Sequence, residues 1–123
     1  MAAPGPESVV REVLVAFNAG DVEGLVGRCH ADVLIVEDPS FPDARTYRGH
    51  EGVREMSARW SEAWANVRST IEELEIDGDT VRIITRFTGE GASTGIPVEI
   101  ERFAVTYRVR DGKVAELRLG QAA

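Results

Sequence analysis

The sequence predicts a single small α+β domain in which helices come first and an antiparallel sheet follows. Apolar residues recur at helical spacing up to about residue 67, alternate beyond it, and are punctuated there by Asp-Gly pairs. Helices grouped before strands favour separate layers over a parallel α/β arrangement. A chain of 123 residues has room for one core. We assign the domain to residues 8–120, after a flexible tail at 1–7.

The N-terminal part predicts two helices joined by a tight corner. Ser8 is the expected N-cap of the first helix, and Gly20 ends it in a left-handed conformation. Its apolar stripe consists of Val10, Val13, Leu14 and Phe17. Asp21 is the expected N-cap of the second helix. The apolar side of that helix consists of Val22, Leu25, Val26 and Cys29.

A first strand is predicted at residues 33–37, and a loop from Asp38 to Tyr47 follows it. The third helix is expected over residues 49–66. Its apolar face consists of Val53, Met56, Trp60, Trp64 and Val67. Alternation then predicts four more strands, at residues 69–76, 80–88, 98–109 and 113–119. Asp-Gly turns at 77–78 and 111–112 join two of the pairs, and a longer glycine-rich hairpin at 89–95 joins the middle strands.

Charge and composition exclude several classes of function. A net charge of −7 disfavours nucleic acids and anionic membranes, which attract clustered Lys and Arg. No apolar run approaches the roughly 18–20 residues that span a bilayer, and the N-terminus lacks the features of a secretory signal. With a single cysteine, a cytoplasmic location is expected. His30 and His50 have no ligand-spaced partners, so neither a metal nor a cofactor is indicated.

Three segments carry a family resemblance that composition does not reveal. They are residues 19–25 (AGDVEGL), 36–39 (VEDP) and 111–114 (DGKV). Over residues 9–119 the layout resembles the nuclear transport factor 2-like superfamily. The segment 9–39 is most similar to steroid Δ-isomerases (ketosteroid isomerases), with SnoaL-like polyketide cyclases close behind. The resemblance implies three helices packed in the concave face of a curved, mostly antiparallel sheet, a small hydrophobic ligand and a homodimer.

The resemblance also implies a general base at Asp38, which would move a proton beside a ketone while hydrogen-bond donors stabilise the oxyanion. In ketosteroid isomerases those donors are a tyrosine and a protonated aspartic acid. At the corresponding positions this sequence has Val13 and either Ala104 or Val105, none of which donates from its side chain. The base is therefore kept and both donors are missing.

Asp38 has two interpretations. Strand alternation places it on the face of Leu34 and Val36, an apolar setting that would raise its pKa. Alternatively, Asp-Pro begins a surface turn. Periodicity does not decide between them, because Val33 and Ile35 make the opposite face apolar too.

Further pocket candidates come from the last helix and the strand at 98–109. Tyr107 shares parity with Phe103 and Val105, and either replaces a missing donor or fills the core. Trp60 and Trp64 share a helix face, and either line a pocket or belong to the core. Met56 and Phe17 would join the tryptophans around a flat ligand. Glu99 and Glu101 share the parity of Phe103. Either one of them flanks the pocket mouth as a second acid, or they lie at a solvated strand end or beside a bulge that resets the parity.

The leading hypothesis is a cofactor-independent acid/base enzyme that acts on a small hydrophobic carbonyl compound. Isomerisation and intramolecular aldol cyclisation both start from the same proton abstraction. Epoxide hydrolysis would need an arginine between two carboxylates, for which Arg86 is the candidate. The alternative from another class is a non-catalytic ligand-binding or dimerisation domain. The expected dimer patch on the outer sheet face consists of Ile96, Val98 and Ile100.

Overall fold

The computed structural model describes residues 5–41 and 43–121, and its first two helices meet at the predicted corner. Helix α1 (Pro6–Asn18) is followed by Gly20 at a φ of 68°, as predicted. The cap of α1 is Gly5 rather than Ser8, because Pro6 supplies a preset φ at the first turn and the helix begins earlier. Of the tail predicted at 1–7, residues 6 and 7 thus belong to α1, and residues 1–4 lie outside the described part. Helix α2 (Val22–Gly27) is capped by Asp21, which accepts a hydrogen bond from the Gly24 N–H at 2.9 Å.

The described residues form one six-stranded sheet, in the order β2-β1-β6-β5-β4-β3. The strands are β1 (Cys29–Glu37), β2 (Thr46–Arg48), β3 (Trp64–Asp77), β4 (Thr80–Gly91), β5 (Pro97–Arg110) and β6 (Lys113–Gln121). Only β1 and β6 pair in parallel among these strands. Gly78 and Gly112 adopt positive φ in the two predicted Asp-Gly turns. The predicted α+β class is confirmed.

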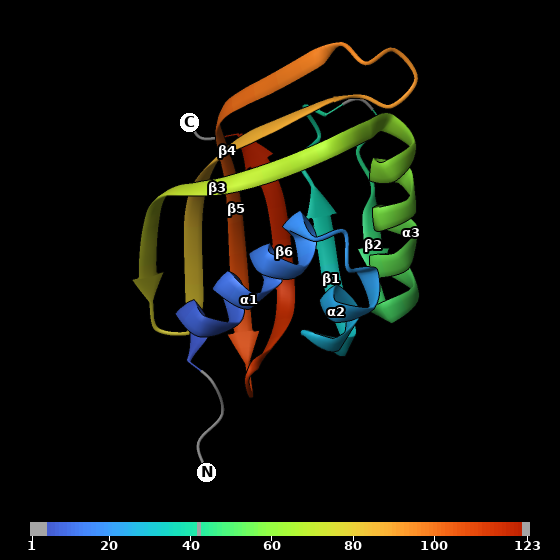
Figure 1. The fold of residues 1–123 in the computed structure, drawn as a ribbon. Coiled ribbons are helices and arrows are strands. Elements are labelled where there is room, and N and C mark those ends of the chain that lie inside the picture. Colours follow the sequence, from blue (N-terminus) through green and yellow to red (C-terminus); the bar gives the residue numbers. More distant parts are fainter. Residues whose placement is uncertain (1–4, 42, 122–123) are drawn as a thin grey trace.

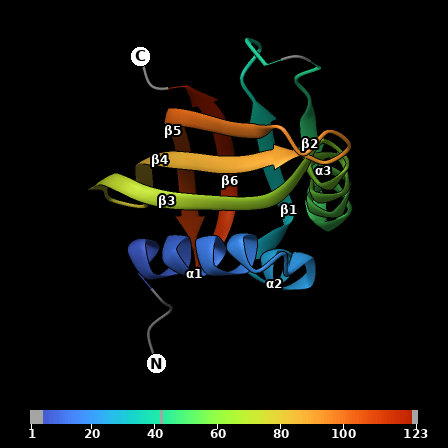
Figure 2. The ribbon, with the colours of Figure 1, turned by 45° about the horizontal axis from the view of Figure 1, so that its top comes forward.

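Helices cover one face of this sheet. In Figures 1 and 2, α1 and α2 run one after the other along that face, and α3 (Gly49–Ala63) stands at the β1–β2 end. Long strands β3, β4 and β5 curve around the helices. Buried valines of α1 and β1, among them Val9 and Val33, form the core with side chains of the central strands. No helix of the described residues is long and apolar enough to cross a membrane.

Three further predicted boundaries are wrong. Helix α2 ends at Gly27, so Cys29 begins β1 instead of lying on a helix. The loop predicted from Asp38 to Tyr47 ends early, because Thr46–Arg48 pairs with β1 as strand β2. The third helix ends at Ala63 rather than at residue 66. Trp64 has extended φ and ψ of −131° and 140°, because it already pairs with Gly91 in the β3–β4 ladder.

Strand β5 contains a bulge that reverses its alternation. Its register with β4 shifts between the pairs Thr85–Phe103 and Phe87–Ile100, and Arg102 in the interval has a φ of 55°. Ile100 therefore faces inward, on the same side as Phe103. Val98, two residues from Ile100 with no register shift between them, lies on the same side. The prediction that Ile100 and Val98 belong to an outer dimer patch is wrong for this reason.

Candidate functional site

A cavity of about 340 Å³ opens between α3, the C-terminal end of β1, the C-terminal half of β4 and the N-terminal half of β5. We call it the aromatic pocket. Its lining residues are Glu37, Phe41, Asp43, Arg59, Trp60, Ala63, Trp64, Phe87, Ile100 and Phe103. A smaller cavity of about 90 Å³ lies deeper, a second of about 80 Å³ lies toward the α1–α2 corner, and Trp60 lines all three. The aromatic pocket is large enough for a ligand of more than a few atoms.

The walls of the aromatic pocket are aromatic rings that contact one another in stacked and edge-to-face arrangements. Phe41 stacks on Phe103 with centroids 5.7 Å apart. Trp60 meets Phe87 and Phe103 edge to face, at 5.7 and 6.3 Å. Trp64 meets Phe87 in the same way at 6.5 Å. Such rings offer flat apolar surfaces against which a planar ligand can stack.

Glu37 brings a carboxylate to this wall. It lies on the face of β1 that carries Val33 and Ile35, and only 8% of its surface is exposed. Two neutral donors hold it: the Arg45 backbone N–H donates to Oε1 at 3.0 Å, and the Trp60 indole N–H donates to Oε2 at 3.0 Å. Both oxygens are thus fixed in place, as a buried carboxylate requires.

Arg59 is, among the described residues, the one cationic side chain that lines the aromatic pocket. Its Nη1 donates to the hydroxyl of the buried Tyr47 at 2.5 Å and lies 3.9 Å from Glu37 Oε1. The hydrogen bond to Tyr47 raises the pKa of Arg59, and the charges of Glu37 and Asp43 add to that effect. The guanidinium is thus a fixed positive charge beside a fixed carboxylate.

Asp38 lies outside this pocket. With Val36 it lines a hollow of about 250 Å³ on the opposite face of the sheet. The Ser40 N–H donates to its Oδ1 at 2.8 Å. Hydrogen bonding by the Ser40 side chain, and then by this N–H, lowers the pKa of Asp38. The predicted apolar setting and raised pKa are wrong, because the face shared by Val36 and Asp38 is the partly exposed one and the aspartate forms a turn there.

The deeper cavity of about 90 Å³ gathers most of the other predicted residues. Its lining includes Phe17, Met56, Trp60, Phe103, Val105 and Tyr107. Burial raises the pKa of Tyr107, so its hydroxyl stays protonated as a possible donor. Val13 also lines this cavity, and Ala104 lies in the hollow on the other face. Trp64 reaches the aromatic pocket from β3 instead of from a helix face.

The remaining predicted groups lie elsewhere. Arg86 points away from the aromatic pocket and pairs with Glu99 at 3.0 Å and Glu101 at 3.8 Å, so it cannot serve as a pocket arginine. His30 and His50 each bond a backbone carbonyl oxygen. Within residues 5–41 and 43–121, no three side chains of His, Cys, Asp or Glu gather in a metal-binding group.

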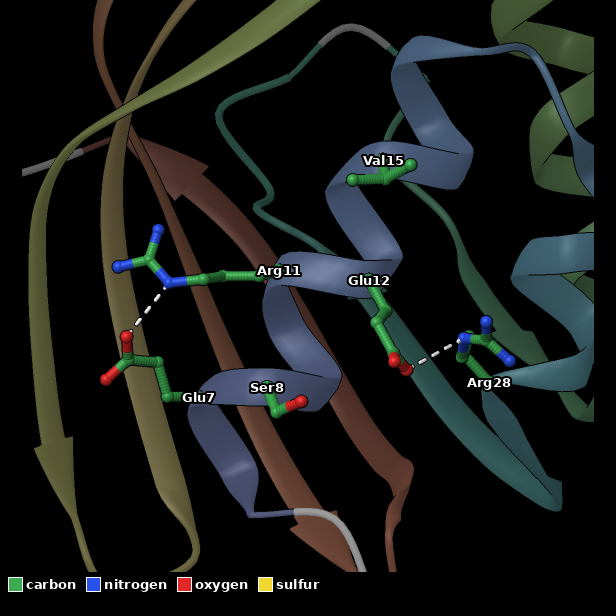
Figure 3. Close-up of a pocket in the computed structure, with 6 residues that line it drawn as sticks. All are labelled: Glu7, Ser8, Arg11, Glu12, Val15 and Arg28. Carbon is green, nitrogen blue, oxygen red and sulfur yellow. Dashed lines mark hydrogen bonds and ion pairs between the residues drawn. The ribbon is translucent and has the colours of Figure 1, made fainter.

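A wider hollow, of about 570 Å³, lies on the outer side of α1. Figure 3 shows its charged side chains paired with one another, Arg11 with Glu7 and Arg28 with Glu12. Val15 beside them is 70% exposed. Surface ion pairs of this kind contribute little and mark no reaction centre. The aromatic pocket is therefore the candidate site.

Sequence reasoning missed Glu37, Arg59 and Phe87. The sequence offers one signal for Glu37, which is that it shares a strand face with Val33 and Ile35. Strand alternation alone does not show whether this face or the opposite one is buried. Arg59 precedes Trp60 on α3, and its position at the pocket depends on the hydrogen bond to Tyr47, which no local pattern encodes.

Comparison with known proteins places the chain in a family. A model of the SnoaL-like domain matches residues 10–117. The chain belongs to the SnoaL-like domain family, within the nuclear transport factor 2-like superfamily, and the resemblance inferred from the sequence is confirmed. No protein of curated function matches the sequence.

Solved structures show the same fold. A hypothetical protein with a ketosteroid isomerase-like fold from Catenulispora acidiphila, solved in complex with trimethylamine, is 22% identical, with a TM-score of 0.83 over 97% of this chain and 88% of that one. IdmH, a putative polyketide cyclase from Streptomyces antibioticus, is 24% identical, with a TM-score of 0.77 over 93% and 89%. An NTF2-like protein from Burkholderia thailandensis is 26% identical, with a TM-score of 0.79 over 94% and 89%.

Proposed function

We propose that the protein is an acid/base enzyme that needs no cofactor and moves a proton on a small hydrophobic carbonyl compound held in the aromatic pocket. The observation that carries this proposal is the Glu37 carboxylate, 8% exposed and fixed by two N–H donors on an aromatic wall. A carboxylate so placed is a suitable general base. Glu37 takes the role that the sequence suggested for its neighbour Asp38.

Residues of the aromatic pocket account for both the proton and the charge in the enolisation step. Glu37 takes a proton from the carbon next to the carbonyl, the C–H electron pair moves into the new C=C bond, and the carbonyl oxygen becomes an enolate. Arg59, 3.9 Å from Glu37, is the group that would stabilise this oxygen. The negative charge moves from Glu37 to the enolate, so the net charge of the site stays constant.

Enolisation begins both isomerisation and intramolecular aldol cyclisation, and the proposal covers either outcome. Membership of the SnoaL-like family agrees with it. Tyr107 remains a proposed second donor for a ligand that reaches the deeper cavity, which it lines together with Phe103 and Val105. Val13 and Ala104 offer no side-chain donor, so Arg59 is the main substitute for the missing oxyanion donors.

The test uses 2-tetralone, a bicyclic ketone with an acidic C1 position. In D₂O, NMR should show protein-dependent exchange of the C1 protons above the rate in matched acetate buffer. Glu37→Gln keeps the size of the side chain and removes the base, so exchange should fall at least about a hundredfold. Exchange that stays at the wild-type rate in Glu37→Gln would remove Glu37 from the mechanism. Binding of 2-tetralone without any exchange would favour the rival, a non-catalytic ligand-binding domain.

A further inference from the structure

The guanidinium of Arg59 has unused hydrogen-bonding capacity at the mouth of the aromatic pocket. A guanidinium carries five N–H donors. Among the described residues, Arg59 makes one hydrogen bond, from Nη1 to Tyr47, and its approach to Glu37 is a long 3.9 Å. Its side chain is 29% exposed, so the unused donors can be reached from the pocket opening.

The neighbouring carboxylates do not take up these donors. Glu37 is already bonded by the Arg45 backbone and by Trp60. Asp43 lines the same pocket and acts on Arg59 by its charge, but forms no ion pair with it within the described part of the chain. The negative charges of Glu37 and Asp43 repel an anionic ligand. Such a ligand would therefore gain binding energy only by direct contact with the Arg59 guanidinium.

Tyr47 fixes the direction of the guanidinium. It is 3% exposed, and a side chain at Gly52 would press on it, since a Cβ there would lie 3.0 Å from the Tyr47 Cβ. Gly52 thus lets α3 approach β2 closely, and Arg59, two turns along the same helix, meets the hydroxyl. A planar guanidinium that is held in one orientation is suited to bind two oxygen atoms that lie in its plane.

From these contacts we propose that the aromatic pocket selects planar, largely apolar acids, whose anionic oxygens bind Arg59 while the rings stack among Trp60, Phe87 and Phe103. The proposal rests on the same pocket as the proposed function and names the class of ligand, but it does not depend on proton transfer. Arg59 is then the residue that determines specificity, and Tyr47 is a positioning residue.

The experiment compares 2-naphthoate with 2-naphthamide, which have nearly the same shape and differ in charge at pH 7. Calorimetry gives both dissociation constants. The ¹⁵N-indole NMR signals give the location, because the chain has two tryptophans and both line the pocket. We expect naphthoate to bind about tenfold more tightly than naphthamide, to weaken with salt, and to shift both indole signals.

The variants assign the preference to one side chain. Arg59→Gln should remove the preference by weakening naphthoate alone, and Arg59→Lys should keep part of it by retaining the charge. Tyr47→Phe should reduce it with the naphthamide affinity unchanged. Arg86→Gln is the matched control, since it removes the same charge from the other side of the sheet and should leave both constants unchanged.

Equal affinities in the wild type, or a preference that survives in Arg59→Gln, would overturn the proposal and leave Glu37 catalysis standing. A preference equally reduced in Arg86→Gln would overturn it too, as an effect of overall charge. Absence of binding by either probe, with unmoved indole signals, would overturn the pocket assignment itself.

Discussion

Glu37 is the last residue of β1 and Asp38 follows it, yet their side chains lie on opposite faces of the sheet. Successive side chains of a strand point to opposite sides, so only one of the two carboxylates can reach the interior. The sequence makes both faces apolar, through Val33 and Ile35 on one and Leu34 and Val36 on the other. The choice depends on where α1 and α3 pack, which strand alternation does not encode. An inward-facing carboxylate in this segment could be predicted, but not which of the two residues provides it.

The turn at Asp38 predicts an effect of pH on stability. Its pKa is lowered in the folded protein by hydrogen bonding with the Ser40 side chain and with the Ser40 N–H. A lowered folded pKa gives stability that is present above the unfolded value, about 3.9, and lost as the pH falls through the folded value.

Asp38→Asn should therefore lower the urea midpoint slightly at pH 7, and the difference from wild type should shrink near pH 3. Because Asp38 lies outside the aromatic pocket, the variant should keep the exchange of 2-tetralone. An Asn variant more stable than wild type at pH 7 would indicate a raised pKa and contradict the turn assignment.

At the scale of elements, the bulge in β5 decides which side chains enter the pocket. Alternation along the sequence predicts that Ile100 is opposite to Phe103. One extra residue at Glu101–Arg102 reverses this, and the reversal depends on the pairing with β4. The same reversal sends Glu99 and Glu101 outward to Arg86, in line with the bulge interpretation.

The inward position of Ile100 can be tested against Ile96, which is 62% exposed in the neighbouring hairpin. Ile100→Ala removes partly buried apolar surface, so it should cost roughly 1–2 kcal/mol, below the 2–5 kcal/mol of a fully buried isoleucine. Ile96→Ala should stay within about 0.5 kcal/mol. Denaturant unfolding of both variants measures this, and equal losses would contradict the bulge.

The junction of α3 and β3 shows a second limit of local patterns. Trp60 and Trp64 are spaced for one helix face, but the helix ends at Ala63 and Trp64 belongs to β3. Both tryptophans still line the aromatic pocket. Trp64 thus reaches the pocket from a different secondary structure than its spacing predicts.

At the scale of the molecule, the α+β class and the order of the elements other than β2 could be predicted. Helical and strand periods differ clearly, and the Asp-Gly turns fix two hairpins in place. The pocket was only partly predictable, because its wall combines β1, α3, β3, β4 and β5. Contacts between such distant segments, for example Arg59 with Tyr47 across elements, arise from packing and leave no local signature.

Assembly remains a prediction from the resemblance to ketosteroid isomerases. We expect a homodimer through the outer sheet face, with a mass near twice the 13.4 kDa of one chain. Ile100 does not contribute to it, since it lines the pocket. Light scattering at high micromolar concentration measures the mass, and a monomer under those conditions would rule out the dimer.

The central claim is that Glu37 and Arg59 act together on a carbonyl compound inside the aromatic pocket. A crystal structure with 2-tetralone tests it most directly. We expect the ring to lie against Trp60 and Phe103, the carbonyl oxygen in hydrogen-bond contact with Arg59, and C1 within about 3.5 Å of a Glu37 oxygen. A ligand bound in the hollow beside Asp38, or one that leaves Glu37 out of reach of C1, would contradict the claim.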